Sequence, residues 1–569
     1  MSQVIIGIYG PKDCSDTNRP LANGGRVSTY IHDHSITILR DGKLTACLPL
    51  ERLTGVKHDN SIEKHITDII EKYVDYEDEV IFALANSFIG SSFCSDDGNL
   101  RIEPNSKISV TSNLIDAEVY WFPKTKITPG SNRREATGYI VSHEFAHIAS
   151  ALQFIGYFKE NSLLVHIDGG ASKSSNSFWH FSDDKIKLLD FGWGELHTLV
   201  SNFNSNPLVR CILSHQSWQH LSIPGKLMGY SSLGKSNSEL RKWLFENNWF
   251  RGMNDSDRHE REKILEEISS KFSKVNDFNP REKIFMDICA TIQSEFEEHV
   301  LNLLNRYKKE TKADHLVYTG GAALNIITNS RIESECGFRS IFVPPCTSDS
   351  GLSLGAAIWV DRIINKGSEK SHSPFIVGEG NSSTDIYFDD IDQTISLLLE
   401  GKVIGICNGK GEIGPRALGN RSIISMMDSV ILRRKVSETI KKREWYRPLA
   451  PIICSEAADV VLPESASSNL SRYMLGSWKV SESWHDSFQG VIHSDCTVRA
   501  QVVPNDPEYS WIHELLSRLW NEYKIPGLIN TSFNKRGEPI LHHHKDAKDA
   551  AINLGLDAVV VEGVLDAIR

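Results

Sequence analysis

The sequence predicts a mixed α/β fold of the kind that binds nucleotides at the ends of its strands. Two strand-like runs support this, because each ends in a turn of acid and glycine or of two glycines. Residues 162–167 are followed by Asp168-Gly169-Gly170, and residues 315–318 by Thr319-Gly320-Gly321, after which helix-like sequence begins. In open α/β sheets, ligands bind at the carboxyl ends of strands, beside such turns.

The remaining elements of the first half can be placed in order. Asp41-Gly42 favours a tight turn and closes a predicted hairpin. Residues 11–26 are rich in Gly, Pro, Asn and Asp, which predicts a loop before that hairpin. Strands are predicted at 4–9, 37–39, 43–48 and 79–85, and a helix at 142–154.

The chain has 569 residues, too many for one hydrophobic core, so at least two domains are expected. Residues 232–310 are mostly charged and helical, which predicts an inserted helical layer. Residues 366–384 are rich in Gly, Ser, Lys, Glu and Pro, which predicts a linker. A strand pattern restarts at 403–407. The predicted domains are therefore residues 1–365 and 385–569.

Composition indicates a soluble globular protein with small-molecule partners. A net charge of −11 argues against a general nucleic-acid surface. The ten cysteines are scattered and form no C-x-x-C pair, which indicates reduced intracellular thiols. No apolar stretch approaches the roughly 20 residues that span a bilayer, and the start reads as a strand rather than a signal peptide. We expect a cytoplasmic monomer or homodimer without membrane or nucleic-acid partners.

Basic residues concentrate on turn-forming sequence in the second half. The loop 412–422 carries Arg416 and Arg421 between glycines and a proline. Guanidinium groups bind phosphate oxygens bidentately, and glycine turns bring backbone N–H groups close. The pattern predicts a pocket for a small phosphate-bearing substrate, although each arginine alone is equally typical of a surface ion pair. The other polar residues of this group are Lys441, Arg443, Arg447, Arg499 and the run 530–534.

Residues 143–147 read H-E-x-x-H, so His143 and His147 lie on one helix face and can chelate a metal. In a metallopeptidase Glu144 would be the general base. The alternative is that the two histidines only pack or cap on a buried helix. Asp168 and Asp349 each follow a strand beside a glycine, which favours a shell of two histidines and carboxylates. Such a shell suits Fe(II), Mn(II) or Zn(II).

Taken in order, the motifs resemble those of the O-carbamoyltransferases of natural-product biosynthesis. That family includes the tobramycin, cephamycin and nodulation-factor carbamoyltransferases. Besides the basic C-terminal motifs, the matching pieces are His32-Asp33, Glu51-Arg52-Leu53-Thr54, Lys57-His58-Asp59, residues 142–151, Asp168-Gly169-Gly170, Gly225-Lys226-Leu227-Met228-Gly229, residues 320–325, Asp349-Ser350-Gly351 and Gly355-Ala356-Ala357.

The resemblance implies an actin-like ATPase (ASKHA-type) N-terminal domain and a YrdC-like α/β C-terminal domain. It implies that the second domain cleaves carbamoyl phosphate to carbamate and phosphate. Carbamate would react with ATP, bound with Mg, to give carbamoyladenylate. The first domain would transfer the carbamoyl group to a hydroxyl of a small metabolite, sugar or antibiotic scaffold. Because free carbamate is short-lived in water, an enclosed path is expected.

The resemblance also implies roles for single residues. His32 is the implied general base, and His34 is its alternative, since both would face one side of an extended segment. Lys57 would contact the acceptor. Lys226, Gly320, Gly321 and Asn325 would bind the nucleotide. The implied metal is iron(II), with zinc or manganese as alternatives, at His143, His147, Asp168 and Asp349. Carbamoyl phosphate would bind at Lys441, Arg447, Arg499, Asn530 and Ser532, to which we add Arg416.

Three departures from the family accompany this match. Ser142 replaces a histidine before the metal helix, and Lys173 lies where relatives carry a glutamate. The loop before His32 is longer than usual, so residues 14–26 are expected to shape the acceptor site. Two other functions remain as alternatives. An H-E-x-x-H metallopeptidase would cleave peptides without ATP, and a non-catalytic scaffold would bind ATP without releasing phosphate from carbamoyl phosphate.

Overall fold

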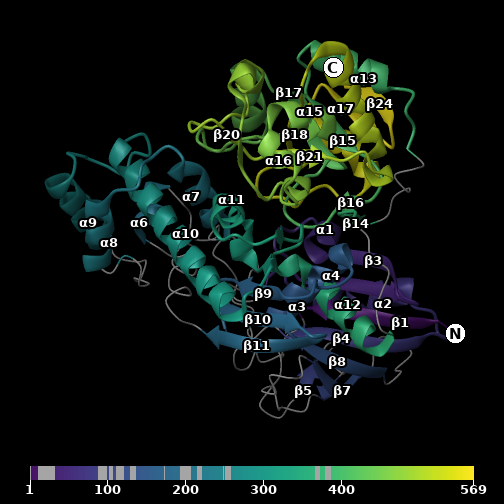
Figure 1. The fold of residues 1–569 in the computed structure, drawn as a ribbon. Coiled ribbons are helices and arrows are strands. Elements are labelled where there is room, and N and C mark those ends of the chain that lie inside the picture. Colours follow the sequence, from purple (N-terminus) through teal and green to yellow (C-terminus); the bar gives the residue numbers. More distant parts are fainter. Residues whose placement is uncertain are drawn as a thin grey trace.

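The computed structural model forms two lobes, one above the other in the view of Figure 1. The lower lobe contains two large sheets and a helical layer, and the upper lobe contains a third large sheet with its own helices. The structure describes residues 2–10, 32–86, 99–101, 107–109, 121–127, 136–171, 174–192, 207–213, 221–247, 249, 258–365, 372–378 and 386–568.

The first sheet has eight strands in the order β16-β14-β3-β2-β1-β4-β8-β7. At its centre, β1 is antiparallel to β2 and parallel to β4. The predicted first strand, the hairpin and the strand at 79–85 are confirmed. Its strands are β1 (Gln3–Tyr9), β2 (Ser35–Arg40), β3 (Lys43–Pro49), β4 (Glu79–Asn86), β7 (Trp121–Ile127), β8 (Ala136–Ser142), β14 (Phe375–Val377) and β16 (Gly411–Glu412).

The second sheet repeats the central arrangement of the first. Its order is β11-β10-β9-β12-β13, with β9 antiparallel to β10 and parallel to β12. In both sheets the first strand is therefore central, with a hairpin on one side and parallel strands on the other. This repeated order is that of the actin-like ATPase fold. The strands are β9 (Ser162–Ile167), β10 (Asn176–Ser182), β11 (Lys185–Gly192), β12 (His315–Thr319) and β13 (Ser340–Phe342).

Two helices fill the space between these sheets. Helix α12 (Leu352–Asn365) packs on β1, β2 and β4, and α3 (His143–Ser150) packs between α12 and β9. The two helices approach closely at Gly355, where a Cβ atom would lie 1.8 Å from the Ala146 carbonyl oxygen. The predicted helix at 142–154 is confirmed in two parts, because Ala151 separates α3 from α4 (Leu152–Ile155). This packing fixes the position of α3, which carries two predicted metal ligands.

The predicted helical layer is also present in the lower lobe. Its longest member is α10, which packs on α7, α8 and α11. Among the helices that the structure describes, none is both long enough and apolar enough to cross a bilayer. The helices of this layer are α6 (Pro207–Ile212), α7 (Ile223–Ser231), α8 (Ser238–Glu246), α9 (Arg258–Lys271), α10 (Lys283–Thr311) and α11 (Ile326–Glu335).

The upper lobe is built on a seven-stranded sheet in the order β21-β18-β22-β17-β15-β23-β24. Its YrdC-like identity stays a prediction. The strands are β15 (Ile404–Cys407), β17 (Arg421–Met426), β18 (Ala450–Cys454), β21 (Gln501–Val503), β22 (Leu528–Ser532), β23 (Ala558–Val561) and β24 (Val564–Ala567). The helices on it are α13 (Ile391–Leu399), α15 (Ser455–Val461), α17 (Ser510–Tyr523) and α18 (Ala547–Leu554).

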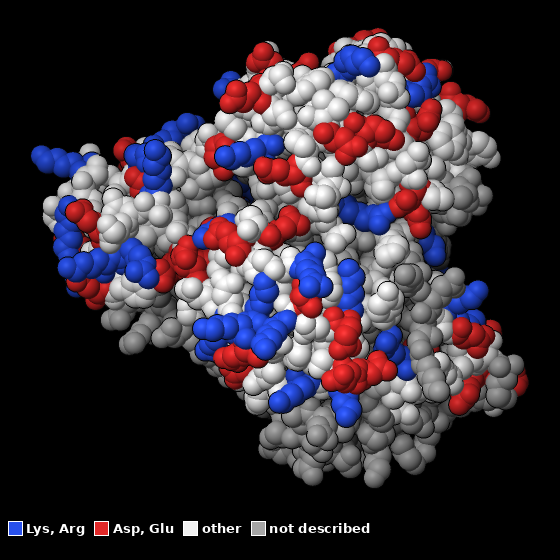
Figure 2. Space-filling model, in the orientation of Figure 1, with Lys and Arg blue, Asp and Glu red and all other residues white. Residues whose placement is uncertain are grey.

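The two lobes share strands at their junction. Strand β14 lies inside the predicted linker, yet it pairs with β3 of the lower lobe and with β16. Strand β16 precedes the Gly-Pro-Arg loop of the upper lobe. The predicted domain boundaries remain predictions, but part of the linker region is a structural strand. On the face drawn in Figure 2, acidic and basic side chains are interspersed over both lobes.

Candidate active site

A cavity of about 400 Å³ lies where the two lobes meet. From the lower lobe it is lined by His32, Lys57, Asp168, Gly321, Asn325 and Asp349, and from the upper lobe by Arg416, Arg447, Ser532 and Asn534. Residues predicted for five different roles therefore border one cavity.

The four predicted metal ligands meet at the lower end of this cavity. His143 and His147 come from the first turns of α3, and their Nε2 atoms are 3.0 Å apart. Oδ1 of Asp349 lies 3.6 Å from the first nitrogen and 3.4 Å from the second. Oδ2 of Asp168, just after β9, lies 3.6 Å from Nε2 of His147. Both imidazoles are buried.

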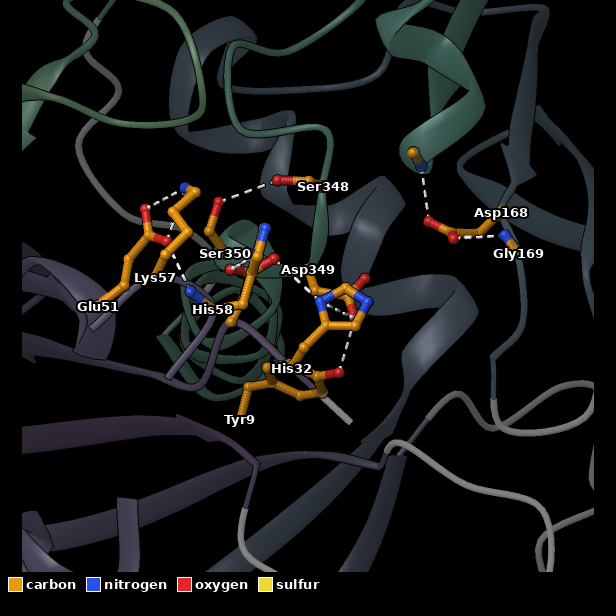
Figure 3. Close-up of polar contacts among 12 residues, drawn as sticks. Tyr9, His32, Glu51, Lys57, His58, Asp168, Gly169, Ser348, Asp349 and Ser350 are labelled. Carbon is orange, nitrogen blue, oxygen red and sulfur yellow. Dashed lines mark hydrogen bonds and ion pairs between the residues drawn. The ribbon is translucent and has the colours of Figure 1, made fainter. Parts of the chain in front are cut away.

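These spacings fit one shared cation. With metal–ligand bonds of about 2.0–2.2 Å, neighbouring donor atoms around one ion are about 3.0–3.6 Å apart. Each carboxylate also accepts a hydrogen bond from a neighbouring group. The Tyr9 hydroxyl donates to Oδ2 of Asp349 at 2.7 Å (Figure 3), and the Gly321 N–H donates to Oδ2 of Asp168 at 2.6 Å. Such outer contacts orient ligands before the metal binds. The donor set fits iron(II), and equally manganese(II) or zinc(II).

The geometry disfavours the metallopeptidase alternative. A peptidase would need the Glu144 carboxylate to activate a metal-bound water. Instead, Glu144 is buried, and its Oε1 accepts hydrogen bonds from the Ser174 N–H at 3.1 Å and the Ser174 hydroxyl at 3.3 Å. This carboxylate therefore holds the loop after Asp168 in position through its hydrogen bonds to Ser174. Ser142, which replaces the family's histidine, caps α3, because its hydroxyl oxygen accepts from the Phe145 N–H.

His32 and His34 occupy different surroundings. Asp33 between them has φ of +59°, so the segment is not extended and the two rings do not share one side. His34 is buried, and its Nδ1 accepts from the Ile62 N–H at 3.4 Å. His32 lines the cavity, with Nδ1 3.9 Å from Oδ2 of Asp349.

Asp33 connects His32 with a residue to which we assigned no role. Its carboxylate oxygens lie 2.9 Å from Nδ1 of His32 and 2.8 Å from Nδ1 of His58. Burial would lower the pKa of His32, but the charges of Asp349 and Asp33 outweigh it and raise this pKa to about 9. The sequence pairs His32-Asp33 and Lys57-His58 were the available signal for this contact.

Lys57 is held by a neighbouring acid at the cavity wall. Its Nζ lies 2.9 and 2.7 Å from the two carboxylate oxygens of Glu51, which also accepts from the His58 N–H (Figure 3). Burial opposes ionisation of Glu51, but Lys57 and other nearby cations hold its pKa below the usual value. An acceptor in this part of the cavity would therefore meet a fixed ion pair. Residues 14–26, predicted to shape the acceptor site, and Lys173 lie outside the described residues.

Of the four predicted nucleotide residues, two line the cavity and two, Gly320 and Lys226, are not among its lining residues. Gly321 and Asn325 line the cavity, and the Asn325 side chain exchanges hydrogen bonds with Gln293 at 3.1 and 3.2 Å. Gly320 has φ of +91°, and a Cβ there would lie 2.1 Å from the Ile167 carbonyl oxygen. This glycine therefore lets β9 and β12 end side by side. Lys226 is buried against the upper lobe, with Nζ 3.0 Å from Oε1 of Glu444.

Four arginines gather at the upper end of the cavity. Burial, together with the charge of Arg447, lowers the pKa of Arg416 to about 10. Burial and the charges of Arg447 and Arg416 lower the pKa of Arg443 to about 9. Burial, together with the charges of the other three arginines, holds the pKa of Arg499 well below its usual value. Within the described part of the chain, Nε of Arg416 and Nε of Arg499 have no hydrogen-bond partner. This is an incompletely compensated positive site, as an anion requires.

The other predicted carbamoyl-phosphate residues support this site. Nζ of Lys441 donates to the Ser532 carbonyl oxygen and to Oδ1 of Asn534, both at 2.6 Å. Asn530 donates to the Ala417 carbonyl oxygen at 3.0 Å, so it fixes the loop that carries Arg416. Asn534 lines this end of the cavity and Arg443 lies close to Arg447 and Arg416, although the family resemblance gave neither residue a role in binding carbamoyl phosphate. Both lie in the basic segments quoted above, which was the signal for them.

Arg421 does not share this environment. It is fully buried, and its guanidinium donates to the carbonyl oxygens of Asn408 at 2.7 Å and Gly409 at 2.9 Å. Arg52 of the lower lobe is buried in a similar way, donating to the carbonyl oxygens of Glu412 and Gly414 at 3.3 and 3.2 Å. One arginine therefore holds the Gly-Pro-Arg loop from within its lobe, and the other holds it from across the junction.

Two family models match the chain. Residues 104–358 match the model described as carbamoyltransferase N-terminus, and residues 395–567 match carbamoyltransferase C-terminus. The nodulation protein NolNO of Sinorhizobium fredii is 26% identical over 558 residues, covering 95% of this chain and 79% of the relative. Nodulation protein NolO of Bradyrhizobium diazoefficiens is 30% identical over 48% of this chain and 53% of its own length.

Similarity to solved structures is weaker. Full-length HypF in its phosphate- and nucleotide-bound form matches with a TM-score of 0.30 and 14% identity, over 65% of this chain and 56% of HypF. A putative N-acetylmannosamine kinase from Listeria monocytogenes matches with a TM-score of 0.27 and 10% identity, over 63% of this chain and 97% of that chain.

Proposed function

The chain belongs to the carbamoyltransferase family, and from this premise we propose that it is an ATP-dependent O-carbamoyltransferase. Its donor would be carbamoyl phosphate, its intermediate carbamoyladenylate, and its acceptor a hydroxyl of a small metabolite or sugar. The observation that carries the proposal is the cavity of about 400 Å³, which joins an arginine-rich end to a histidine- and aspartate-rich end. An unstable fragment made at one end would therefore have only the length of this cavity to travel to the other.

At the arginine-rich end, the guanidinium groups bind the phosphate of carbamoyl phosphate. Arg416 and Arg447 line the cavity, and Arg443 and Arg499 add positive charge behind them. As water attacks the carbamoyl carbon and the C–O bond to phosphate breaks, negative charge grows on the leaving phosphate. These cations stabilise that charge, and the products are carbamate and inorganic phosphate. Nζ of Lys441 holds the Ser532 carbonyl and the Asn534 side chain in place beside them.

At the other end, carbamate attacks the α-phosphate of ATP, so carbamoyladenylate forms and pyrophosphate leaves. Gly321 and Asn325 border the cavity where the adenosine part would bind, and glycine permits close approach of a ligand to the backbone. His143, His147, Asp168 and Asp349 would hold iron(II), which when bound supplies a Lewis acid for a carbonyl or phosphoryl oxygen. Magnesium would accompany the nucleotide.

His32 takes the proton of the acceptor hydroxyl as its oxygen attacks the carbamoyl carbon and AMP leaves. A base must be neutral, whereas the carboxylates around His32 raise its pKa to about 9. Because a bound cation would offset the charge of Asp349, we expect metal loading to lower this pKa towards the working pH. Asp33 holds Nδ1 of the ring, which leaves Nε2 for the acceptor.

The test is incubation of the purified protein with carbamoyl phosphate, ATP, Mg and Fe(II), with carbamoyladenylate measured by mass spectrometry and phosphate and pyrophosphate measured separately. We expect all three products, and then transfer to a member of a panel of hydroxylated metabolites. Release of no phosphate under any nucleotide condition would refute the function and would match the scaffold alternative. Peptide cleavage without ATP would support the peptidase alternative instead.

A further inference from the structure

His166 has no assigned role, yet it lies beside the metal ligands. It is on β9, two residues before Asp168. Because side chains alternate along a strand, it projects to the same face as that aspartate, towards α3. Its side chain is fully buried. A buried imidazole so close to two others requires an explanation.

The two ring nitrogens of His166 have different surroundings. Nδ1 lies 3.3 Å from the hydroxyl of Ser177, the residue directly opposite on β10. Nε2 is buried and, within the described parts of the chain, has no hydrogen-bond partner. Buried polar atoms are nearly always paired, so an orphaned ring nitrogen indicates a partner that is not a protein atom. Metal-binding histidines commonly show this division, with the second nitrogen bonded to a supporting group.

The ring positions allow all three histidines to reach one ion. The His166 ring centroid lies 5.1 Å from that of His147 and 6.2 Å from that of His143, and the last two are 4.8 Å apart. With a metal–nitrogen bond of about 2.1 Å, an imidazole centroid lies about 3.2 Å from the ion, so two rings on one ion are at most about 6.4 Å apart. Every pair satisfies this limit. Ligand atoms of the three rings also lie within 4.8 Å of one another.

We propose that Nε2 of His166 is a further ligand of the metal held by His143, His147, Asp168 and Asp349. The inference rests on the metal site of the proposed function and extends it. The protein would then supply three nitrogens and two oxygens. Such a shell favours an ion that accepts five or six ligands, such as Fe(II) or Mn(II), over tetrahedral Zn(II). On a six-coordinate ion, one position would remain open for a substrate oxygen.

X-ray absorption on the metal-loaded wild-type protein tests the inference without any substitution. We expect outer-shell scattering from three imidazoles on bound Co(II) or Fe(II). Two imidazoles would overturn the role of His166 and leave the metal site of the proposed function intact. Failure of the protein to bind either ion would overturn the metal site itself, and the role of His166 with it.

Substitution gives a second, independent readout. His166→Asn and His166→Gln should weaken Co(II) binding by at least about 10- to 100-fold and alter the visible Co(II) spectrum. His180→Asn is the matched control, because His180 lies on the neighbouring strand and bonds Asn161 away from the site. Melting of the metal-free proteins identifies variants that fold. A folded His166 variant with wild-type Co(II) affinity and spectrum would contradict the inference. If neither variant folds, the number of imidazoles found by X-ray absorption on the wild-type protein tests the inference.

Discussion

The two ends of the cavity carry opposite charge. The lower end joins Asp168 and Asp349 to a pair of histidines, and the upper end joins four arginines around Arg447. Each end is compensated only in part by its own lobe. The carboxylates accept from the Gly321 N–H and the Tyr9 hydroxyl, whereas the arginines share the nearby carboxylate of Glu444 with other cations.

This contrast in charge indicates how one cavity could serve the two reactions of the proposed function. A site with surplus negative charge favours a cation, and a site with surplus positive charge favours a phosphate, because each ligand cancels the charge it meets. In the proposed function the two ligands bind at separate positions, so the two reactions should be separable by substitution.

Replacing His147 by alanine should abolish transfer but spare phosphate release. The metal is expected to contribute several kcal/mol to the reaction at the lower end, which corresponds to about a 10³-fold loss of carbamoyl transfer. Release of phosphate from carbamoyl phosphate should stay at the wild-type rate, measured in the same samples. Glu144→Gln is the matched control on the same helix, and it should have a small effect because this carboxylate contacts Ser174. Equal loss of both reactions in His147→Ala would show that the two ends are not separate.

Replacing Arg447 by alanine should give the reverse result. Phosphate release should fall by about 10²- to 10³-fold, as for loss of one group that stabilises charge in a transition state. Transfer from chemically supplied carbamoyladenylate should be unchanged. The control is Arg434→Ala, an exposed arginine on α14 (Val430–Arg434) of the same lobe. A wild-type rate of phosphate release in Arg447→Ala would place carbamoyl phosphate elsewhere.

Replacing His32 by alanine should separate two steps within the lower end. Carbamoyladenylate should still form, because His32 acts only on the acceptor. Transfer should fall by about 10²-fold, the lower range for loss of a general base, and the adenylate should accumulate. Mass spectrometry of the quenched reaction measures both. Loss of adenylate formation together with transfer would indicate that His32 supports the metal rather than the acceptor.

Much of this arrangement follows from local sequence. Glycine turns after β9 and β12 predicted where Asp168 and Gly321 lie, and the four-residue spacing of His143 and His147 predicted a shared helix face. These features depend on residues close in the chain. The environment of His34 could not be predicted from local sequence. It depends on the positive φ of Asp33, and this segment contacts residues 58–62, which are more than 20 positions away in the chain.

Features that depend on contacts between residues distant in the chain were harder to predict from the sequence. Strand β14 has linker-like composition, and it is ordered by pairing with β3, more than 300 residues earlier, and with β16. Arg416 and Arg421 lie in one loop, yet Arg416 lines the cavity and Arg421 is buried in the protein interior. Most of the carbonyl groups that accept from Arg421 lie outside the loop, so no spacing within the loop distinguishes the two arginines.

The smallest predicted effect concerns Lys226, which lies between the two ends. We expected it to contact the nucleotide, but its Nζ lies 3.0 Å from Oε1 of Glu444, whose Oε2 lies 3.9 Å from Arg447. Without this lysine, Glu444 should attract Arg447 more strongly and compete with phosphate. Lys226→Ala should therefore raise the KM for carbamoyl phosphate about fivefold, equivalent to about 1 kcal/mol, and leave the KM for ATP unchanged.

Arg536 provides the matched variant for this last comparison, because its guanidinium also lies 2.8 Å from Oε1 of Glu444 and comes from the upper lobe itself. If the carboxylate transmits the effect, Arg536→Ala should raise the KM for carbamoyl phosphate in the same direction, and Glu444→Gln should cancel the effect of either substitution. An increase in the KM for ATP alone in Lys226→Ala would instead support direct contact with the nucleotide. The ion pair would then have to open when ATP binds, and the two oppositely charged ends would be coupled through this lysine.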